Sequence, residues 1–316
     1  MCGIAGVLDP TGSLSSEALQ HTARAMGQAL AHRGPDDHGT WVDDRVGIAL
    51  AHRRLSVIDL STEGHQPMVS ASGRYVITYN GEIYNYAAVR HDLEAIGAAP
   101  VWRGHSDTEV MLAAVERWGM ADALQRFNGM FAFALWDRQE RVLHLARDRM
   151  GEKPLYYGVM GRRFAFGSEL SAMRAAPSFR GEVDRDALAL LLRYNYVPAP
   201  WSIYRDVRKL CPGARAEIRV DGAGLPAIHT FAYWSVAEAA RRGIAAAGRC
   251  DEREAADLVR AELDRSVRLR MVADVPIGAF LSGGIDSTLV TATMQRLSSQ
   301  RVRTFTIGFD DGEYDE

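Results

Sequence analysis

Cysteine is scarce in this sequence of 316 residues. The three cysteines, Cys2, Cys211 and Cys250, are an odd number without paired spacing, which argues against a disulfide framework and for a reducing compartment. Cys211 and Cys250 have no close candidate ligands, and the nine histidines form no HxxxH or HExxH pattern. A structural zinc site is therefore not expected.

Long hydrophobic runs and an excess of one charge are also missing. No apolar stretch reaches the length of a membrane span. The N-terminal apolar run lacks a preceding basic region and is interrupted by Asp9 and Pro10, unlike a secretory signal. The net charge of −3 gives no reason to expect a nucleic-acid or membrane partner. We expect a cytoplasmic protein of about two domains.

Cys2 is the first residue that suggests chemistry. Removal of Met1 would leave Cys2 with a thiol nucleophile and a free α-amino group. Their reference pKa values, about 8.5 and about 7.7–8.0, lie near neutrality, and an N-terminal amine can act as the base for its own side chain. A lone cysteine more often behaves as a small buried hydrophobe, so other residues must support this interpretation.

The first 170 residues contain many short apolar segments separated by turns, which are typical of strands. Helical spacing occurs over residues 15–31 and 107–118, with Ser106 as the cap of the second helix and Glu109 completing a capping box. This mixture predicts a layered α+β domain. The expected strands cover residues 2–8, 46–51, 75–79, 132–136, 142–146, 155–159 and 164–166.

Towards the end of the chain the pattern changes to one βαβ unit of a parallel sheet. A helix over residues 252–270 precedes a strand over 275–281, a helix over 287–297 and a strand over 302–309. Between the first strand and the second helix lies the loop 282–287, with the sequence SGGIDS. Its glycines and the start of the helix favour phosphate oxygens, and Asp286 could hold a Mg²⁺ ion bound to them. The lysine of a Walker A loop is missing.

Five further positions fit an α-amino acid ligand that carries a side-chain amide. Asn80 and the N–H of Gly81, placed after the strand 75–79, could stabilise an oxyanion, and Arg54 could pair with a carboxylate. Glu82 and Asp107 could both receive an ammonium group. Taken singly, each has a simpler interpretation: an Asn-Gly turn, a solvated arginine or a helix cap. Together with Cys2 they indicate glutamine as the ligand.

These motifs resemble the glutamine-hydrolysing asparagine synthetases, whose N-terminal half is a class II (N-terminal nucleophile) glutamine amidotransferase. The matching segments are 2–4 (CGI), 32–36 (HRGPD), 54–56 (RLS), 80–85 (NGEIYN), 106–109 (SDTE), 128–133 (NGMFAF), 147–148 with 151–157 (RD and GEKPLYY), 167–169 (GSE) and 282–287 (SGGIDS). The resemblance covers essentially the whole chain, in the family's order.

The resemblance implies a four-layer αββα glutaminase followed by the start of a doubly wound α/β domain of the adenine-nucleotide alpha-hydrolase type. Cys2, Asn80 and Gly81 would be catalytic, with glutamate and ammonia as products. ATP with Mg²⁺ would activate aspartate as an acyl-adenylate in the second domain, and ammonia would amidate it. The glutamine site would comprise Arg54, Leu55, Ser56, Val57, Ile58, Asn80, Gly81, Glu82 and Asp107. The ATP site would comprise Leu281, Ser282, Gly283, Gly284, Asp286, Ser287 and Ile307.

The implied domains are a glutamine amidotransferase domain over residues 2–216, a connecting segment over 217–250, and the first part of a synthetase domain over 251–316. Because the family's synthetase domain continues far beyond its phosphate loop, we expect a truncated chain that retains only the glutaminase half. Two alternatives stay open: an amidotransferase acting on another carboxylate acceptor, and a non-catalytic fragment. A homodimer is a further expectation.

Overall fold

The computed structural model describes the whole chain except residues 178, 221–223, 247, 249 and 309–316. The chain divides into two compact units, Met1–Arg241 and Arg242–Glu316. Within the described residues, no helix is both long and apolar enough to cross a membrane.

The first unit contains two six-stranded sheets. In the first, strand β1 (Gly3–Leu8) lies between β9 and β3, antiparallel to both. This sheet has the order β10-β8-β9-β1-β3-β2, with β10 at Val207–Lys209, β8 at Tyr156–Met160, β9 at Arg163–Gly167, β3 at Ile48–Arg54 and β2 at Asp37–Asp43.

The second sheet has β5 (Tyr75–Ile83) beside β6 (Gly129–Asp137), paired over their full lengths. Its order is β12-β11-β7-β6-β5-β4, with β12 at Pro226–Ala232, β11 at Ala214–Val220, β7 at Val142–Arg147 and β4 at Met68–Val69. Residues 217–250, expected as a connecting segment, include the end of β11, β12 and helix α6 (Val236–Ala246).

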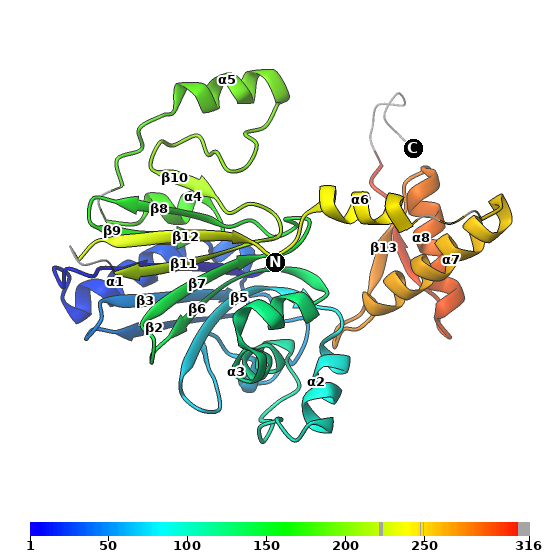
Figure 1. Cartoon of the computed structure of the whole chain (residues 1–316), viewed down its shortest axis with the longest axis horizontal. Coiled ribbons are helices and arrows are strands. Elements are labelled where there is room, and N and C mark those ends of the chain that lie inside the picture. The colour runs from blue at the N-terminus through cyan, green and yellow to red at the C-terminus, as the bar shows by residue number, and fades with distance from the viewer. Residues whose placement is uncertain (178, 221–223, 247, 249, 309–316) are drawn as a thin grey trace. The chain divides into compact units, whose positions relative to one another are not determined.

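This unit has four layers, namely the two sheets and the helices outside each of them (Figure 1). Three hydrophobic clusters pack between neighbouring layers. Residues of both sheets, such as Ile4 and Trp136, form the middle cluster. Helices α1 (Ser16–Gln28) and α4 (Leu170–Arg174) cover the outer face of the first sheet. Helices α2 (Tyr86–Ala95) and α3 (Asp107–Arg126) cover the outer face of the second sheet. The expected αββα order is therefore confirmed. Helix α5 (Arg185–Tyr194) and the 3₁₀ turns η1 (Ala31–Arg33) and η2 (Thr62–Gly64) complete the unit.

Two local predictions need correction. The strand expected over residues 75–79 continues to Ile83, so Asn80 and Gly81 lie inside β5, because the whole segment pairs with β6. The expected capping box is only half present. Ser106 accepts a hydrogen bond from the N–H of Glu109, but the Glu109 carboxylate accepts from the backbone N–H groups of Arg103 and Gly104.

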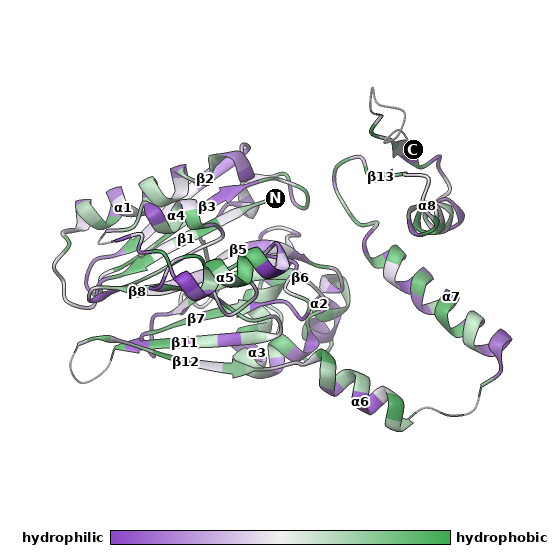
Figure 2. Ribbon diagram, turned by 90° about the horizontal axis from the view of Figure 1, so that it is seen from above, coloured by the Kyte–Doolittle hydropathy of each residue, from purple (hydrophilic) through white to green (hydrophobic). Residues whose placement is uncertain are grey.

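The second unit contains the predicted βαβ arrangement. Strands β13 (Gly278–Phe280) and β14 (Arg303–Phe305) are parallel and are joined through helix α8 (Ile285–Leu297). Phe309, at the end of the strand expected over 302–309, lies outside the described residues. Helix α7 (Glu252–Leu269) precedes the unit's strands and carries hydrophobic residues interspersed with hydrophilic ones (Figure 2).

Candidate active site

A cavity of about 140 Å³ in the first unit has Cys2 in its wall. A cavity of this order holds a small molecule rather than a polymer. The candidate glutamine-site residues that line it are Cys2, Arg54, Leu55, Val57, Ile58, Asn80, Gly81, Glu82 and Asp107. Ser56 lines a neighbouring depression instead, and its N–H donates to Asp36 Oδ2 at 2.8 Å. The fold thus gathers residues from β3, β5, α3 and the start of the chain.

The Cys2 thiol contacts the backbone of Leu55, which directly follows β3. The Leu55 N–H donates to Cys2 Sγ at 3.4 Å, and the thiol lies 3.6 Å from the Leu55 carbonyl oxygen. Arg33 Nε donates to the Cys2 carbonyl at 2.9 Å, and Arg33 Nη1 donates to Glu169 Oε1 at 2.7 Å. Burial raises the pKa of the thiol, so Cys2 needs a base to become a nucleophile near neutral pH.

Asn80 and Gly81 present donors to this cavity from the middle of a strand. Among the described residues, Asn80 Nδ2 is buried without a hydrogen-bond partner, which is unusual for a native amide. Alternate N–H groups of a strand point to the same side. The N–H groups of Tyr79 and Ile83 donate to Gln66 Oε1 and Asp107 Oδ2, so the N–H of Gly81, between them, points to that side too.

Asp107 is the first residue of α3 and is 6% exposed. Its Oδ2 accepts hydrogen bonds from the Tyr79 hydroxyl at 2.8 Å and from the Ile83 N–H at 2.9 Å. Burial raises the pKa of this carboxyl despite those bonds. A ligand ammonium beside Asp107 would restore the favourable environment that burial removes.

Arg54 ends β3 and is also buried. Its guanidinium donates to the carbonyl oxygens of Ser61 at 3.1 Å, Ile58 at 3.4 Å and Asp59. These bonds fix the loop after β3 against the cavity and place a positive charge in its wall.

Sequence reasoning did not assign several residues of this wall. Gln66 links two elements, because its Oε1 accepts from the Tyr79 N–H at 2.7 Å and its Nε2 donates to Thr108 Oγ1 at 3.3 Å. Nothing in the sequence around this single glutamine indicates that role. Lys153 belongs to the segment 151–157 (GEKPLYY), which resembles the family, but no role was predicted for it. The other unassigned lining residues are Met1, Gly64, Tyr79, Ser106, Thr108 and Met130.

The loop 282–287 of the second unit lies between the end of β13 and the start of α8. Ser287 Oγ donates to the carbonyl oxygens of Ser282 and Gly284 at 2.8 and 3.1 Å. Gly284 is the N-cap residue and leaves the helix without a side-chain cap, so its first N–H groups are available to an anion. Leu281 follows β13, its N–H donating to Phe305 O at 2.9 Å, and Ile307 is exposed after β14.

Two family models match this chain. The model of the glutamine amidotransferase domain matches residues 1–234, and that of asparagine synthase matches residues 258–316. A Methanocaldococcus jannaschii protein named putative asparagine synthetase (glutamine-hydrolyzing) 2 is 34% identical over 337 residues, which cover 100% of this chain and 61% of that protein. Asparagine synthetase (glutamine-hydrolyzing) 1 of Bacillus subtilis is 34% identical over 316 residues, 100% of this chain and 47% of its own length.

The chain thus spans roughly half to three-fifths of the length of these relatives. Among solved structures, a glutamine phosphoribosylpyrophosphate amidotransferase from B. subtilis is similar with a TM-score of 0.53 and 16% identity. The similarity covers 96% of this chain and 65% of the other. At this identity the likeness shows the fold alone.

Proposed function

This chain belongs to the glutamine amidotransferase family, and we propose that its Cys2 hydrolyses the side-chain amide of glutamine to glutamate and ammonia. The observation that carries the proposal is one cavity lined by the Cys2 thiol and by the buried Asn80 amide, which has no partner among the described residues. Arg54 and Asp107 in the same wall match the carboxylate and the ammonium group of an amino acid.

The proposed reaction begins after removal of Met1, when the α-amine of Cys2 takes the proton of the thiol. The sulfur attacks the amide carbon, and the oxyanion accepts hydrogen bonds from Asn80 Nδ2 and the N–H of Gly81. The C–N bond then breaks, the protonated amine returns its proton, and ammonia leaves a glutamyl thioester. Water adds to the thioester carbon, and the C–S bond breaks to give glutamate and the free thiol.

Charge complementarity orients the substrate in this proposal. The α-carboxylate lies against Arg54 and the backbone of residues 55–58, with Ser56 contributing from the edge of the site. The α-ammonium lies between Glu82 and the buried carboxylate of Asp107.

We further propose that the ammonia serves a carboxylate activated by ATP. The match of residues 258–316 to the asparagine synthase model and the names of the relatives support aspartate as that acceptor, with another carboxylate as the alternative. In this proposal Leu281, Ser282, Gly283, Gly284, Ser287 and Ile307 surround ATP. The described residues contain no group of three acidic, histidine or cysteine side chains that could hold a metal. Asp286 alone suits Mg²⁺ that is shared with phosphates. A cytoplasmic location and a homodimer stay predictions.

The test is glutamate release from glutamine by the purified chain. We expect Cys2→Ala to abolish release and Asn80→Ala to lower kcat by about 10²–10³-fold. Cys211→Ala, which alters an exposed cysteine, should leave the rate unchanged and serves as the matched control. Equal rates for the unmodified chain and Cys2→Ala would overturn the proposal.

A further inference from the structure

Lys153 is a buried cation that the proposed reaction does not use. It is 6% exposed and lines the same cavity as Cys2. Among the described residues, no hydrogen bond or ion pair involves its ammonium group. Its nitrogen is not among the fully buried atoms that lack a partner, so it reaches the cavity. A cation that is largely removed from water and has no anionic partner is unfavourable, so its retention needs a physical reason.

The loop that carries Lys153 is held firmly in place. The buried carboxylate of Asp148 accepts hydrogen bonds from the N–H groups of Phe131, Met150, Glu152 and Lys153, at 2.9–3.1 Å. Arg147 donates to the carbonyl oxygens of Lys153, Gly151 and Leu210, each at 2.7 Å. The position of Lys153 is therefore fixed by its backbone and not by a salt bridge of its own.

Most other charges near the cavity already have partners. Arg33 is paired with Glu169, Arg54 donates to three carbonyl oxygens, and Asp107 accepts from Tyr79 and Ile83. Burial lowers the pKa of Lys153, and the nearby Glu152 and Cys2 oppose that effect. The charged or titratable groups around this cavity, among the described residues, are the Met1 amine, Cys2, Arg33, Asp36, Arg54, Tyr79, Glu82, Asp107, Asp148, Glu152 and Lys153.

We propose that Lys153 is a positioning residue whose ammonium group stabilises the thiolate of Cys2 and, once Met1 is removed, keeps the α-amine of Cys2 unprotonated. A fixed positive charge favours the deprotonated form of both groups. Together with Arg54, it thereby opposes the burial that disfavours the thiolate, and it leaves an amine free to accept the thiol proton. The inference rests on the proposed role of Cys2 as the nucleophile.

The test follows alkylation of Cys2 by iodoacetamide as a function of pH, without glutamine. The background is Cys211→Ser with Cys250→Ser, which removes the two exposed thiols, and mass spectrometry confirms removal of Met1 and labelling of Cys2. Lys153→Met keeps the length of the side chain and removes its charge, whereas Lys153→Arg keeps the charge.

We expect the midpoint of the alkylation profile to rise by about one pH unit in Lys153→Met. Lys153→Arg should keep the midpoint of the unmodified chain. An unchanged midpoint in Lys153→Met, or the same rise in both variants, would overturn the inference. Circular dichroism checks folding, and Lys153→Gln replaces Lys153→Met if that variant does not fold.

This test can fail independently of the proposed function, because alkylation measures the acidity of the Cys2 thiol and not the hydrolysis of glutamine. A shifted midpoint in a chain that releases no glutamate would support the role of Lys153 while contradicting the glutaminase. Normal glutamate release with unshifted midpoints would support the glutaminase while contradicting the role of Lys153.

Discussion

Asp107 illustrates at the scale of one residue how a binding site can oppose stability. Burial raises the pKa of its carboxyl, so the folded state binds a proton more tightly than the unfolded chain does. Stability that depends on this group therefore falls as the pH rises above the unfolded value of about 3.9. The carboxylate is unfavourable for the empty protein near pH 7 and becomes favourable when an ammonium group binds.

Replacing Asp107 by asparagine should make the protein more stable and less active. Asparagine keeps an oxygen to accept from Tyr79 and Ile83 but carries no charge. We expect the free energy of unfolding in urea to rise by about 1 kcal/mol at pH 7, with the gain disappearing below about pH 4. The kcat/KM for glutamine should fall at least about tenfold.

Asp122→Asn is the matched control, because Asp122 is exposed on the same helix α3. It should change neither stability nor kcat/KM. A stability difference for Asp107→Asn that stays constant between pH 7 and pH 4 would contradict the assigned electrostatic cause.

At this scale the sequence predicts residues whose chemistry is recognisable from their type and neighbours. Cys2, Arg54 and Asp107 were predicted in this way and share one cavity. Gln66 could not be predicted, because its role depends on contacts with Tyr79 and Thr108 that lie 13 and 42 positions away. That Asn80 Nδ2 has no hydrogen-bond partner among the described residues could likewise be seen only in the structure.

At the scale of an element, β5 shows tertiary pairing overriding local preference. An Asn-Gly dipeptide is typical of a turn, which explains why the strand was expected to end at residue 79. In the structure Gly81 pairs with Phe131 of β6, and a Cβ atom on Gly81 would lie 2.2 Å from the carbonyl oxygen of Met130. The glycine is thus needed for close strand contact rather than for a turn.

Helix α3 shows a local signal that located a break in the helix but not its end. Its expected end at residue 118 coincides with a kink at Gly119, where φ is +75°. Glycine adopts this conformation readily. The helical segment that follows, up to Arg126, was missed because the break resembles a helix end.

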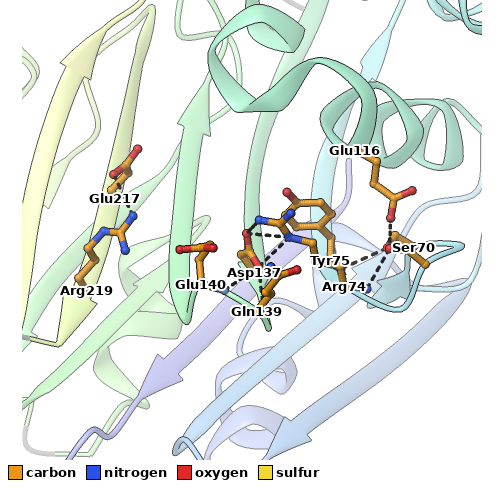
Figure 3. A network of polar contacts seen from close by, with 10 residues as sticks. Ser70, Arg74, Tyr75, Glu116, Asp137, Gln139, Glu140, Glu217 and Arg219 are labelled. Atoms are coloured by element: carbon orange, nitrogen blue, oxygen red, sulfur yellow. Dashed lines mark hydrogen bonds and ion pairs between the residues drawn. The ribbon is translucent and has the colours of Figure 1, made fainter. Parts of the chain in front are cut away.

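Arg74 joins the beginning of β5 to the end of β6 (Figure 3). Its guanidinium donates to both oxygens of Asp137, with the shortest contact at 2.6 Å, and lies over the Tyr75 ring. Burial alone would raise the pKa of Asp137, but the bonds from Arg74 and from the N–H groups of Glu140 and Gln139 lower it. The pair therefore stabilises the fold when Asp137 is ionised.

Removing this cation in Arg74→Ala should destabilise the first unit by about 1 kcal/mol at pH 7, because the arginine is still one-third exposed and screened by solvent. A depressed pKa contributes stability that is lost as the pH falls, so the difference should shrink below about pH 4. Urea unfolding at pH 7 and at pH 3.5 measures it.

Arg219→Ala is the control, since the exposed Arg219 lies 3.9 Å from Glu217, which keeps Arg215 as a closer partner (Figure 3). We expect little change in stability from that variant. Equal losses for the two arginine variants would show that the burial of Asp137 is unimportant.

At the scale of the whole molecule, the layered architecture was predictable from the sequence. The strands within residues 217–250, which were expected to form a connecting segment, were not. Alternating strands and amphipathic helices indicated an α+β domain, and the three clusters show how its layers pack. The edge strand β12, with Pro226 and mostly half-buried or exposed residues, offered little alternation to detect. It pairs with β11 along its whole length, which no periodicity in the sequence specifies.

The second unit exposes much apolar surface in the part that the structure describes. Leu258 and Val259 of α7 are 66% and 69% exposed, and Phe280 of β13 is 75% exposed. A single βαβ unit has too few elements to cover both faces of its sheet. Exposed apolar surface binds hydrophobic dyes and, where it is extensive, promotes association.

A chain of residues 1–241 should therefore fold alone and keep the proposed hydrolysis. Every residue of the three clusters and of the Cys2 cavity precedes Arg241, so neither the packing nor the site needs later residues. We expect glutamate release within about threefold of the full chain, the same main thermal transition, and weaker binding of the dye ANS. The shortened chain with Cys2→Ala controls for background hydrolysis. A loss of the thermal transition, or a fall in rate above tenfold, would show that residues 242–316 contribute to the first unit's stability or chemistry.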